Sequence, residues 1–566
     1  MKVLIVGGYG TFGARLARLL ADDARLTLAI AGRSLAKAEA FCAGLDAQAG
    51  LGPVVMDRDG DVAAVLAAEA PDIVVDAAGP FQLYGRDPYR LVRACIEAGA
   101  NYLDLADSAD FVVGIEAFEA TAKARGVFVL SGLSTFPALS SAVVQALAGD
   151  LDRIEVVRAG VAPSPWAGIG PNVVRAISSY AGKPLSILRG GRRVGAPALI
   201  DDLSRTIAPP GGVPLRPIRF SLAETPDLAL AERQWPGVRE VWTGAGPTPG
   251  LLHRLLSCLA WLVRLKVVPT LEPLAGLFHW GTRVFRWGEA RGGMFVEVEG
   301  VSGEASVRRS WHLVAEGDDG PFIPSMGAAA LIAEAASGVT PEPGARPAVH
   351  ALTLTEYEAQ FARFDIAAGR RDEAPAGGEP LYRRILGGAW DRLPEAVRAM
   401  HDLDGQMTAA GEGAVERGRH PLARLVGGLI GLPPAADRVP VTVRFTERDG
   451  VERWTRTFGR SSFASTQEEG RGPFGRLVVE RFGPVALGLA LVAEEDRVRL
   501  HIRRVSVFGV PLPASLWPRL DTVESVDPVG RFRFDDRVTL PLAGLLVRYR
   551  GWLVPARQPV ELRNRK

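Results

Sequence analysis

The sequence VLIVGGYGTFG, residues 3–13, decides how the N-terminus of this chain folds. An apolar strand, a glycine-rich turn and then a helix follow one another in a dinucleotide-binding βαβ unit, and the helix start presents N–H groups to phosphates. Gly8 allows the tight turn, Gly10 lets the backbone approach a pyrophosphate, and Gly13 lets helix and strand pack closely. The alternative is a glycine turn in a fold that binds no nucleotide. We predict a dinucleotide site formed by Gly7, Gly8, Gly10, Thr11, Phe12 and Gly13.

The end of the second strand indicates which dinucleotide binds. The apolar run 26–31 ends in Gly32-Arg33-Ser34. NAD-specific folds usually place an acidic residue about 20 residues beyond the glycines, where it holds the ribose 2′-hydroxyl. Here Arg33 stands at that position with Ser34 beside it, and a guanidinium suits a 2′-phosphate. We therefore predict NADP(H) in preference to NAD(H); the alternative is a solvated arginine at the start of the next helix.

The composition is that of a globular cytoplasmic protein. With 566 residues, 47% hydrophobic and 23% charged, the chain is long enough for two or three domains. A net charge of +2 gives no reason to expect nucleic-acid binding, and the three cysteines lack metal-ligand spacing, so no metal is predicted. Because the first strand begins at Lys2, no room remains for a signal peptide. This leaves attachment to a membrane surface open.

The first predicted domain, residues 1–150, is an α/β domain with a doubly wound parallel sheet of the Rossmann type. Strands expected at 54–57, 73–78, 100–105 and 127–130 alternate with helical segments. A ligand of such a sheet lies across the carboxyl ends of its strands. Four further residues fall near these ends and are predicted to contact the cofactor: Asp57, Ala78, Gly79 and Pro80.

Two further domains are expected. The pattern of residues 151–365 predicts an α+β substrate or dimerisation domain that is built on an open antiparallel sheet. A helix expected at 328–336 would bring the chain back toward the first domain. Residues 366–379 have the composition of a linker. Residues 380–566 begin with helical segments and continue as a mostly antiparallel β domain, either a sheet or an incomplete barrel, with a hairpin turn at Asp449-Gly450.

An amphipathic segment covers residues 251–287. Leucines from Leu251 to Leu262 fall on one stripe of a helix, and His253, Arg254 and Ser257 lie opposite. The apolar run is too short and too charged to span a bilayer. It is either an ordinary helix packed on the core, or it lies flat in a membrane interface or lines a hydrophobic substrate groove.

The chemistry points to a redox cofactor. None of the seven histidines falls in the first 250 residues, and no Ser-His-Asp or HExxH pattern is evident. With a nicotinamide, the cofactor carries the hydride, and the protein positions the acceptor and supplies a proton. Candidate catalytic residues near the carboxyl edge of the sheet are Tyr84, Asp104 and Asp107, and Lys183 is the candidate from the second domain. Each also has a structural alternative, as a packed tyrosine, a capping aspartate or a turn lysine.

A family resemblance supports this interpretation. The stretch AAGPF at 77–81, then Tyr84-Gly85, Ala94-Cys95, Gly99 and Tyr102 with Asp104, resembles the saccharopine dehydrogenase-like family over about residues 1–350. The resemblance implies a Rossmann domain, a substrate domain with a mixed sheet, and an NAD(P)-dependent oxidoreductase. Family members include amino-acid-forming dehydrogenases, enoyl reductases acting on lipid chains, and lipid-associated proteins.

The chain departs from this family in two ways. Many members have Gly-Glu after the YxD motif, where this chain has Ala106-Asp107. No set of basic residues is placed to clamp two carboxylates, so saccharopine itself is not the expected substrate. The C-terminal residues from Leu381 to Leu553 are similar to domain-of-unknown-function family 4166.

The leading prediction is an NADP(H)-dependent oxidoreductase that reduces an apolar enoyl, imine or carbonyl compound. The first alternative is a dinucleotide-sensing protein whose C-terminal domain binds a hydrophobic ligand or partner. The second is a membrane-surface scaffold. A homodimer is compatible with all three hypotheses.

Overall fold

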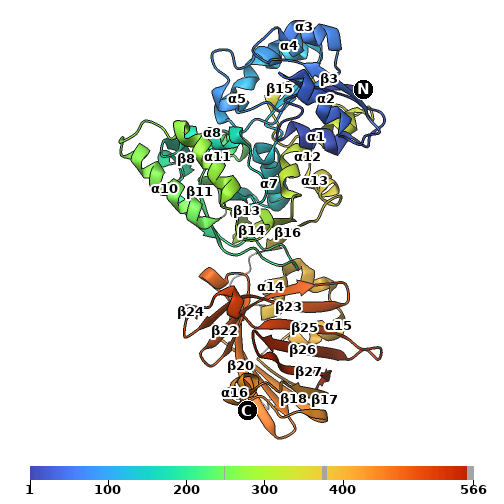
Figure 1. Cartoon of the computed structure of the whole chain (residues 1–566), viewed down its shortest axis with the longest axis vertical. Coiled ribbons are helices and arrows are strands. Elements are labelled where there is room, and N and C mark those ends of the chain that lie inside the picture. Colours follow the sequence, from blue (N-terminus) through green and yellow to red (C-terminus); the bar gives the residue numbers. More distant parts are fainter. Residues whose placement is uncertain (248, 373–378, 404, 557–566) are drawn as a thin grey trace. The chain divides into compact units, whose positions relative to one another are not determined.

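The computed structural model describes residues 1–247, 249–372, 379–403 and 405–556, and it divides into two compact units (Figure 1). Unit 1 contains Met1–Arg205 and Ile218–Ala368. Unit 2 contains Thr206–Pro217 and the chain from Gly369 onward. No sequence pattern indicated that 206–217 would join the C-terminal unit.

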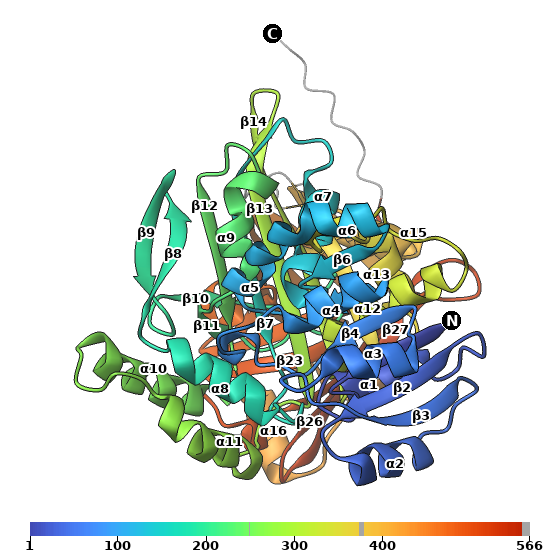
Figure 2. The same ribbon diagram turned by 90° about the horizontal axis from the view of Figure 1, so that it is seen from above.

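The first sheet of unit 1 is parallel and has the strand order β15-β6-β5-β4-β1-β2-β3, which confirms the predicted doubly wound fold (Figure 2). Its strands are β1 (Lys2–Val6), β2 (Thr27–Gly32), β3 (Gly50–Val55), β4 (Ile73–Asp76), β5 (Asn101–Asp104), β6 (Phe128–Ser131) and β15 (Gly344–Pro347). Strand β15 was not predicted, because four residues that end in proline carry no strand pattern. Strand β3 starts before the predicted residue 54, because Gly52 and Pro53 interrupt the apolar pattern at its beginning. It ends at Val55, before Asp57.

Helices cover both faces of this sheet. They are α1 (Gly13–Leu20), α2 (Leu35–Ala43), α3 (Val62–Glu69), α4 (Arg90–Ala98), α5 (Ala109–Gly114) and α6 (Glu119–Arg125), whereas α7 (Ser140–Ala148) packs on strands of the second sheet. In α1 the spacing of Leu16, Leu19 and Leu20 places all three on one face, and all three are buried as expected. The helix therefore packs firmly behind the glycine-rich turn.

The second sheet of unit 1 is mixed, as the family resemblance implied; from β10 to β14 it is antiparallel except at the pairing of β12 with β7, which the residue pattern did not predict. Its order is β10-β11-β12-β7-β13-β14-β16, with β8 and β9 as a side ribbon on β12. Strand β12 runs parallel to β7, because a long crossover that includes a helix separates them in the chain. The strands are β7 (Arg153–Ala162), β8 (Pro184–Arg189), β9 (Arg192–Pro197), β10 (Asp202–Arg205), β11 (Ile218–Leu222), β12 (Glu240–Ala245), β13 (Arg291–Ser302), β14 (Ala305–Glu316) and β16 (Ile366–Asp372).

Strand β16 also corrects the predicted linker. Residues 366–372, expected to be part of a linker, form strand β16, which begins in unit 1 and enters unit 2 at Gly369, and residues 373–378 lie outside the described residues. The remaining helices of unit 1 are α8 (Pro171–Tyr180), α9 (Pro226–Gln234), α10 (Gly250–Arg264), α11 (Ala275–Val284), α12 (Ile323–Ala335) and α13 (Leu354–Phe361).

The amphipathic segment forms α10 and α11, and the apolar stripe of α10 is only partly buried. The buried residues of α10 are His253, Ser257, Ala260 and Val263, and the Ser221 hydroxyl lies 2.8 Å from Nε2 of His253. Leu256 and Leu259 pack against the same small core. The backbone approaches closely here, since a Cβ on Gly182 would lie 2.2 Å from the Ala260 carbonyl oxygen. Leu251 and Leu255 remain 58% and 53% exposed.

Unit 2 is an antiparallel barrel that closes on itself, whereas the sequence predicted a sheet or an incomplete barrel. The strand order is β22-β21-β20-β19-β18-β17-β27-β26-β25-β23, and pairing of β22 with β23 completes a ring of 10 strands in the described part of the chain. The hairpin turn was predicted correctly, since Asp449 and Gly450 have φ of 54° and 80°.

The elements of unit 2 follow the predicted order of helices before strands. They are α14 (Leu381–Leu386), α15 (Glu395–His401), β17 (Gln406–Arg417), α16 (Pro421–Leu429), β18 (Ala436–Arg448), β19 (Val451–Phe458), β20 (Ser461–Glu469), β21 (Val478–Phe482), β22 (Val485–Ala493), β23 (Arg497–Val507), β24 (Val510–Pro511), β25 (Arg519–Val526), β26 (Phe532–Leu540) and β27 (Gly544–Pro555). Strand β24 is a short extension that pairs with β23.

Candidate cofactor and substrate site

The glycine-rich turn joins β1 to α1 with a close backbone approach. Gly7, rather than Gly8, has the left-handed conformation of the turn, with φ of 77°. Gly8 is required for space, because a Cβ there would lie 2.9 Å from Cγ2 of Ile30. A Cβ on Gly13 would lie 2.3 Å from the Gly7 carbonyl oxygen, so the start of α1 rests directly on the turn.

The segment before α8 lies against this turn and the end of β4. A Cβ on Gly170 would lie 2.5 Å from Oγ1 of Thr11. The side-chain amide of Asn172 donates to the carbonyl oxygens of Ala78, at 3.3 Å, and Gly79, at 3.0 Å. The predicted cofactor residues around the turn and around Ala78 are therefore brought together at the carboxyl edge of the sheet.

The end of β2 forms a positively charged corner. The Tyr9 ring covers Gly32, and its hydroxyl accepts from the Ser34 N–H at 3.0 Å. Ser34 caps α2 by accepting from the Lys37 N–H at 3.4 Å. Arg33 and Lys37 are both exposed. Sequence reasoning missed Lys37, although its place in the first turn after Arg33-Ser34 was a usable signal.

Asp57 and Pro80 lie at the same edge as the rest of the predicted cofactor residues. Asp57 follows β3, and its carboxylate accepts from the Asp59 N–H at 3.1 Å. Strands β2 and β3 are paired up to Gly32 and Val55, so Asp57 and Arg33 follow neighbouring strand ends. Pro80 precedes the short helix that begins at Phe81.

A pocket of about 510 Å³ lies between the parallel sheet and the second sheet of unit 1. One wall comes from the first domain and contains the aromatic side chains of Phe81, Tyr84, Tyr89 and Phe111 together with polar residues such as Ser108 and Asp110. The other wall is polar and comes mainly from the second domain: Ser179, Tyr180, Lys183, Glu224, Thr270 and Glu272. Among the predicted catalytic residues, Tyr84 and Lys183 thus face the same space.

Tyr84 belongs to a buried cluster behind the aromatic wall. Its hydroxyl donates to Oδ1 of Asp76 at 3.1 Å, and the Arg58 guanidinium lies 3.4 Å from the centre of its ring. Burial raises the pKa of Asp76, and the charge of Arg58 opposes this rise. Burial also raises the pKa of Tyr84, so the phenol stays protonated. Sequence reasoning missed Arg58, which carries no recognisable motif.

The two predicted aspartates have different surroundings. Asp104 is fully buried and accepts from the backbone N–H groups of Gly132, at 2.7 Å, and Ala106, at 3.0 Å. Burial raises the pKa of Asp104 to about 7, but its side chain is not among those lining the pocket in the described structure. Asp107 accepts from the Gln82 amide at 3.1 Å, and loss of surrounding water raises its pKa.

Glu224 lines the pocket, and its pKa is shifted by burial and by neighbouring charges. Burial raises the pKa of Glu224 to about 7, and the negative charges of Asp107 and Asp110 add to this rise. An N–H of Ala109 and the charge of Lys183 oppose it. Lys183 follows α8 through a turn in which its N–H donates to the Tyr180 carbonyl at 3.0 Å. No local pattern around Glu224 distinguishes it in the sequence.

Comparison with known families agrees with this geometry. Residues 3–130 match the family model described as the saccharopine dehydrogenase NADP binding domain. The N-terminal domain is of this type. Residues 393–553 match the family described as domain of unknown function DUF4166. Both resemblances predicted from the sequence are confirmed, and the second names no activity.

Solved structures with related folds are distant. Saccharopine dehydrogenase (L-Glu forming) from Saccharomyces cerevisiae is 12% identical, with 66% of this chain and 100% of that chain covered and a TM-score of 0.47. Biliverdin reductase from Synechocystis is 15% identical, with 64% and 96% covered and a TM-score of 0.26. These scores are too low to support an argument about activity. None of the curated proteins matches the chain.

The NADP-binding domain supports an NAD(P)-dependent oxidoreductase with a nicotinamide dinucleotide cofactor. The partly exposed glycine-rich turn and the positively charged corner at Arg33 are compatible with the pyrophosphate and the ribose of that cofactor. No helix in the described residues is long and apolar enough to cross a membrane.

Proposed function

We propose that unit 1 is an NADP(H)-dependent oxidoreductase that reduces a carbonyl, imine or enoyl bond in a substrate with an apolar part. The observation that carries this proposal is the pocket at the carboxyl edge of the NADP-binding sheet, where an aromatic wall faces Lys183 and Glu224. A nicotinamide bound at this edge supplies the hydride. The aromatic wall accommodates the apolar part of the substrate.

The preference for NADP(H) rests on the corner at the end of β2. Arg33 and Lys37 are exposed cations, and the N-terminus of α2 adds backbone N–H groups beside Ser34. A 2′-phosphate has two negative charges and three acceptor oxygens, which these donors satisfy. The sequence from Ala31 to Ala38 contains no carboxylate that would bind a free 2′-hydroxyl.

Glu224 is the proposed proton donor. An acid is most effective when its pKa is close to the working pH, and the pKa of Glu224 is raised to about 7. Lys183 lies in the same pocket and orients the polar end of the substrate. Asp107 acts through its charge on Glu224 and is a positioning residue. Tyr84 shapes the aromatic wall, and the buried Asp104 holds the loop after β5.

Turnover tests this proposal against the dinucleotide-sensing alternative. The purified full chain is loaded with NADPH and offered aromatic and aliphatic aldehydes, cyclic imines and enoyl esters. Oxidation of NADPH, followed by absorbance, is expected with at least one class and requires the substrate. Tight NADPH binding without oxidation by any class would instead favour a sensing role.

We also propose that the surface of α10 and α11 contacts a membrane. Figure 2 shows the two helices side by side, and both contribute to one small core. Large apolar side chains remain exposed outside that core, including Trp261, Leu277 and Trp280 at 49%, 59% and 55%. Between 250 and 288 the only acidic residue is Glu272, which pairs with Arg175 at 3.0 Å. The cations of this segment are Arg254, Arg264, Lys266, Arg283 and Arg286.

Exposed apolar side chains with tryptophans, in a segment that has five cations and one paired acid, match the interface of an anionic bilayer. Flotation with phosphatidylcholine vesicles, with and without phosphatidylserine, tests the contact. The double variant Leu255→Ser/Trp280→Ser is expected to lose most binding to the anionic vesicles. The control Leu425→Ser/Leu429→Ser changes leucines of α16 that are 61% and 81% exposed and should bind as the unmodified chain does. Equal loss in both variants would contradict the proposal.

A further inference from the structure

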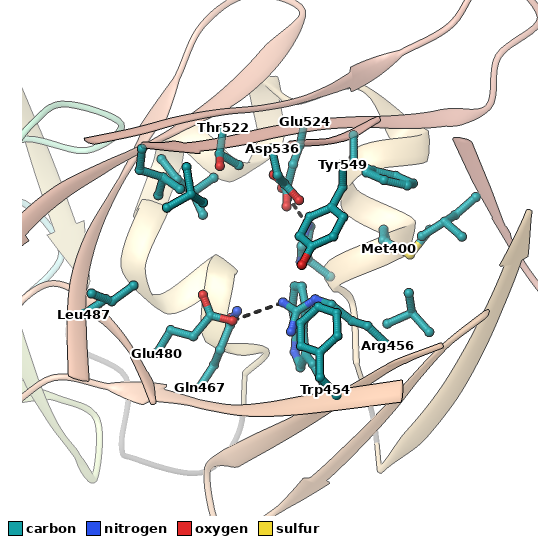
Figure 3. Close-up of a pocket in the computed structure, with 18 of the residues that line it drawn as sticks. Met400, Trp454, Arg456, Gln467, Glu480, Leu487, Thr522, Glu524, Asp536 and Tyr549 are labelled. Atoms are coloured by element: carbon teal, nitrogen blue, oxygen red, sulfur yellow. Dashed lines mark hydrogen bonds and ion pairs between the residues drawn. The ribbon is translucent and has the colours of Figure 1, made fainter. Parts of the chain in front are cut away.

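The barrel of unit 2 encloses a cavity of about 140 Å³ (Figure 3). Its lining is mostly aromatic and aliphatic, with rings from Phe458, Phe463 and Tyr549 among others. Tyr382 and His401, from the helices before the first barrel strand, also line it, and their rings stack with centroids 3.7 Å apart. A cavity of this size admits a compound of about the size of benzene.

Charged side chains project into this apolar space, and the acids outnumber the bases. Glu480 accepts from Arg456 at 3.0 Å and from the Ser465 hydroxyl at 2.7 Å. Glu524 lies 2.8 Å from Nε2 of His401. Asp536 lines the same cavity, and no ion pair to it occurs within the described residues. Figure 3 shows Glu524 and Asp536 together on one side of this space and Glu480 on the opposite side.

Several polar atoms in the cavity wall have no hydrogen-bond partner among the described residues. They are Oε1 of Gln467 and the hydroxyl groups of Tyr382 and Tyr549. The three side chains are only 1%, 1% and 7% exposed. Buried polar groups in proteins are nearly always hydrogen-bonded. These atoms line one cavity together with Asp536, an acid without an ion pair among the described residues, so they point to a ligand that donates hydrogen bonds.

The charges decide which ligand chemistry fits. A carboxylate or phosphate would need a free cation, but Arg456 is already paired with Glu480 and the remaining acids would repel an anion. A protonated amine supplies a positive charge, and its N–H groups can donate to the Asp536 carboxylate and to a tyrosine oxygen. Aromatic rings around a cation add to its binding.

The strand register separates the polar from the apolar part of the cavity. Thr522 of β25 pairs with Asp536 of β26, and two residues further along the strands Leu520 pairs with Val538. Both pairs line the cavity, since side chains two residues apart face the same side. A ligand with one polar end and an apolar body can therefore place its polar end beside Thr522 and Asp536 and its body beside Leu520 and Val538.

We propose that the barrel of unit 2 binds a small organic amine, with the ammonium group at Asp536 and the apolar body against Leu520, Val538 and the aromatic rings. Burial and the charge of Glu524 raise the pKa of Asp536 to about 7, although the charge of Arg456 and a hydrogen bond from the Thr522 side chain oppose this rise. A bound ammonium would lower this pKa again. The site is separate from the reductase pocket and does not depend on the activity proposed for unit 1.

Three probes that differ only in their polar group test the proposal: benzylamine, benzyl alcohol and benzoate. Isothermal titration calorimetry of the full chain at pH 7.5 is expected to show benzylamine binding at least about tenfold more tightly than benzyl alcohol, and benzoate not binding. The variant Asp536→Asn is expected to lose at least about tenfold in benzylamine affinity and to bind benzyl alcohol unchanged. These tenfold steps correspond to about 1.4 kcal/mol each.

The neighbouring Asp535 provides a matched control. It lies on the outer face of the same strand and pairs with Arg548 at 2.8 Å, so Asp535→Asn removes one charge without entering the cavity. A second variant, Leu487→Trp, fills the cavity and is expected to abolish binding of both benzylamine and benzyl alcohol. Thermal melts confirm that each variant is folded. Binding of benzoate as tight as that of benzylamine, no binding of any probe, or equal losses in Asp535→Asn and Asp536→Asn would overturn the proposal.

Discussion

The pocket of unit 1 and the cavity of unit 2 each contain a carboxyl group whose pKa is raised to about 7, Glu224 in the first and Asp536 in the second. The pocket lies at the edge of a cofactor-binding sheet, beside Lys183. The cavity lies inside a closed ring of strands, where the other acids already have partners. We therefore interpret the raised carboxyl pKa as a sign of proton transfer in the pocket of unit 1 and of ligand binding in the cavity of unit 2, because the neighbouring groups differ.

The largest expected effect concerns the turn that makes unit 1 a cofactor domain. In Gly13→Ala the new Cβ would lie 2.3 Å from a backbone oxygen, which cannot move without displacing the turn. We expect NADPH affinity to fall by about 100-fold or more, equal to about 2.7 kcal/mol, as measured by titration calorimetry. Gly52→Ala is the control, because a Cβ there meets no atom within 4 Å. If both variants bind NADPH normally, the turn does not hold the cofactor.

The next prediction tests whether Glu224, with its raised pKa, donates the proton in the proposed reduction. A proton donor must be protonated, so kcat/KM should be highest at low pH and fall as pH rises above about 7. Glu224→Gln cannot donate a proton and should lower kcat by about 100-fold and remove this pH dependence. Glu272→Gln is the control, since Glu272 lines the pocket but pairs with Arg175. An unchanged profile in Glu224→Gln would assign the proton to another group.

A smaller effect is expected at the corner that selects the cofactor. Arg33→Ala should weaken NADPH binding by about tenfold, or about 1.4 kcal/mol, while NADH binding stays the same. Arg125→Ala removes an exposed arginine at the end of α6 and should change neither. Equal weakening of NADPH and NADH by Arg33→Ala would show that this arginine does not bind the 2′-phosphate.

The cofactor side of unit 1 was predictable because its determinants are local. The glycines from Gly7 to Gly13 and the residues around Ala78 stand at strand ends that the sequence marks clearly, and parallel pairing brings those ends together. Glu224 and Tyr180 were missed, since long-range packing of the second sheet places them in the pocket. Arg58 was missed for the same reason, as only the fold brings it to Tyr84.

The sequence pattern also did not predict which residues of α10 are buried or that the strands of unit 2 close into a barrel. The leucine stripe of α10 allowed either a core helix or an exposed apolar surface, and the structure combines the two: Val263 is buried, whereas Leu251 and Leu255 are exposed. The strands of unit 2 could be read from their alternation, whereas the pairing of β22 with β23 that closes the barrel depends on the whole set of strands. The cavity, and with it the role of Asp536, exists only because of this closure.

The smallest expected effect is a pH-dependent change in thermal stability that arises from the buried carboxyl group of Asp536. In the folded barrel Asp536 keeps its proton up to about pH 7, whereas in the unfolded chain an aspartate loses it near pH 3.9, a reference value for free peptides. The folded state therefore binds more protons between these limits, so raising the pH through this window destabilises it. Asp536→Asn removes this loss, and its melting midpoint should exceed that of the unmodified chain by about 2–4 °C at pH 8 but not at pH 4. Asp535→Asn, which loses an outer ion pair, should show no such gain, and saturating benzylamine should reduce the difference at pH 8, because the amine supplies a positive charge beside Asp536.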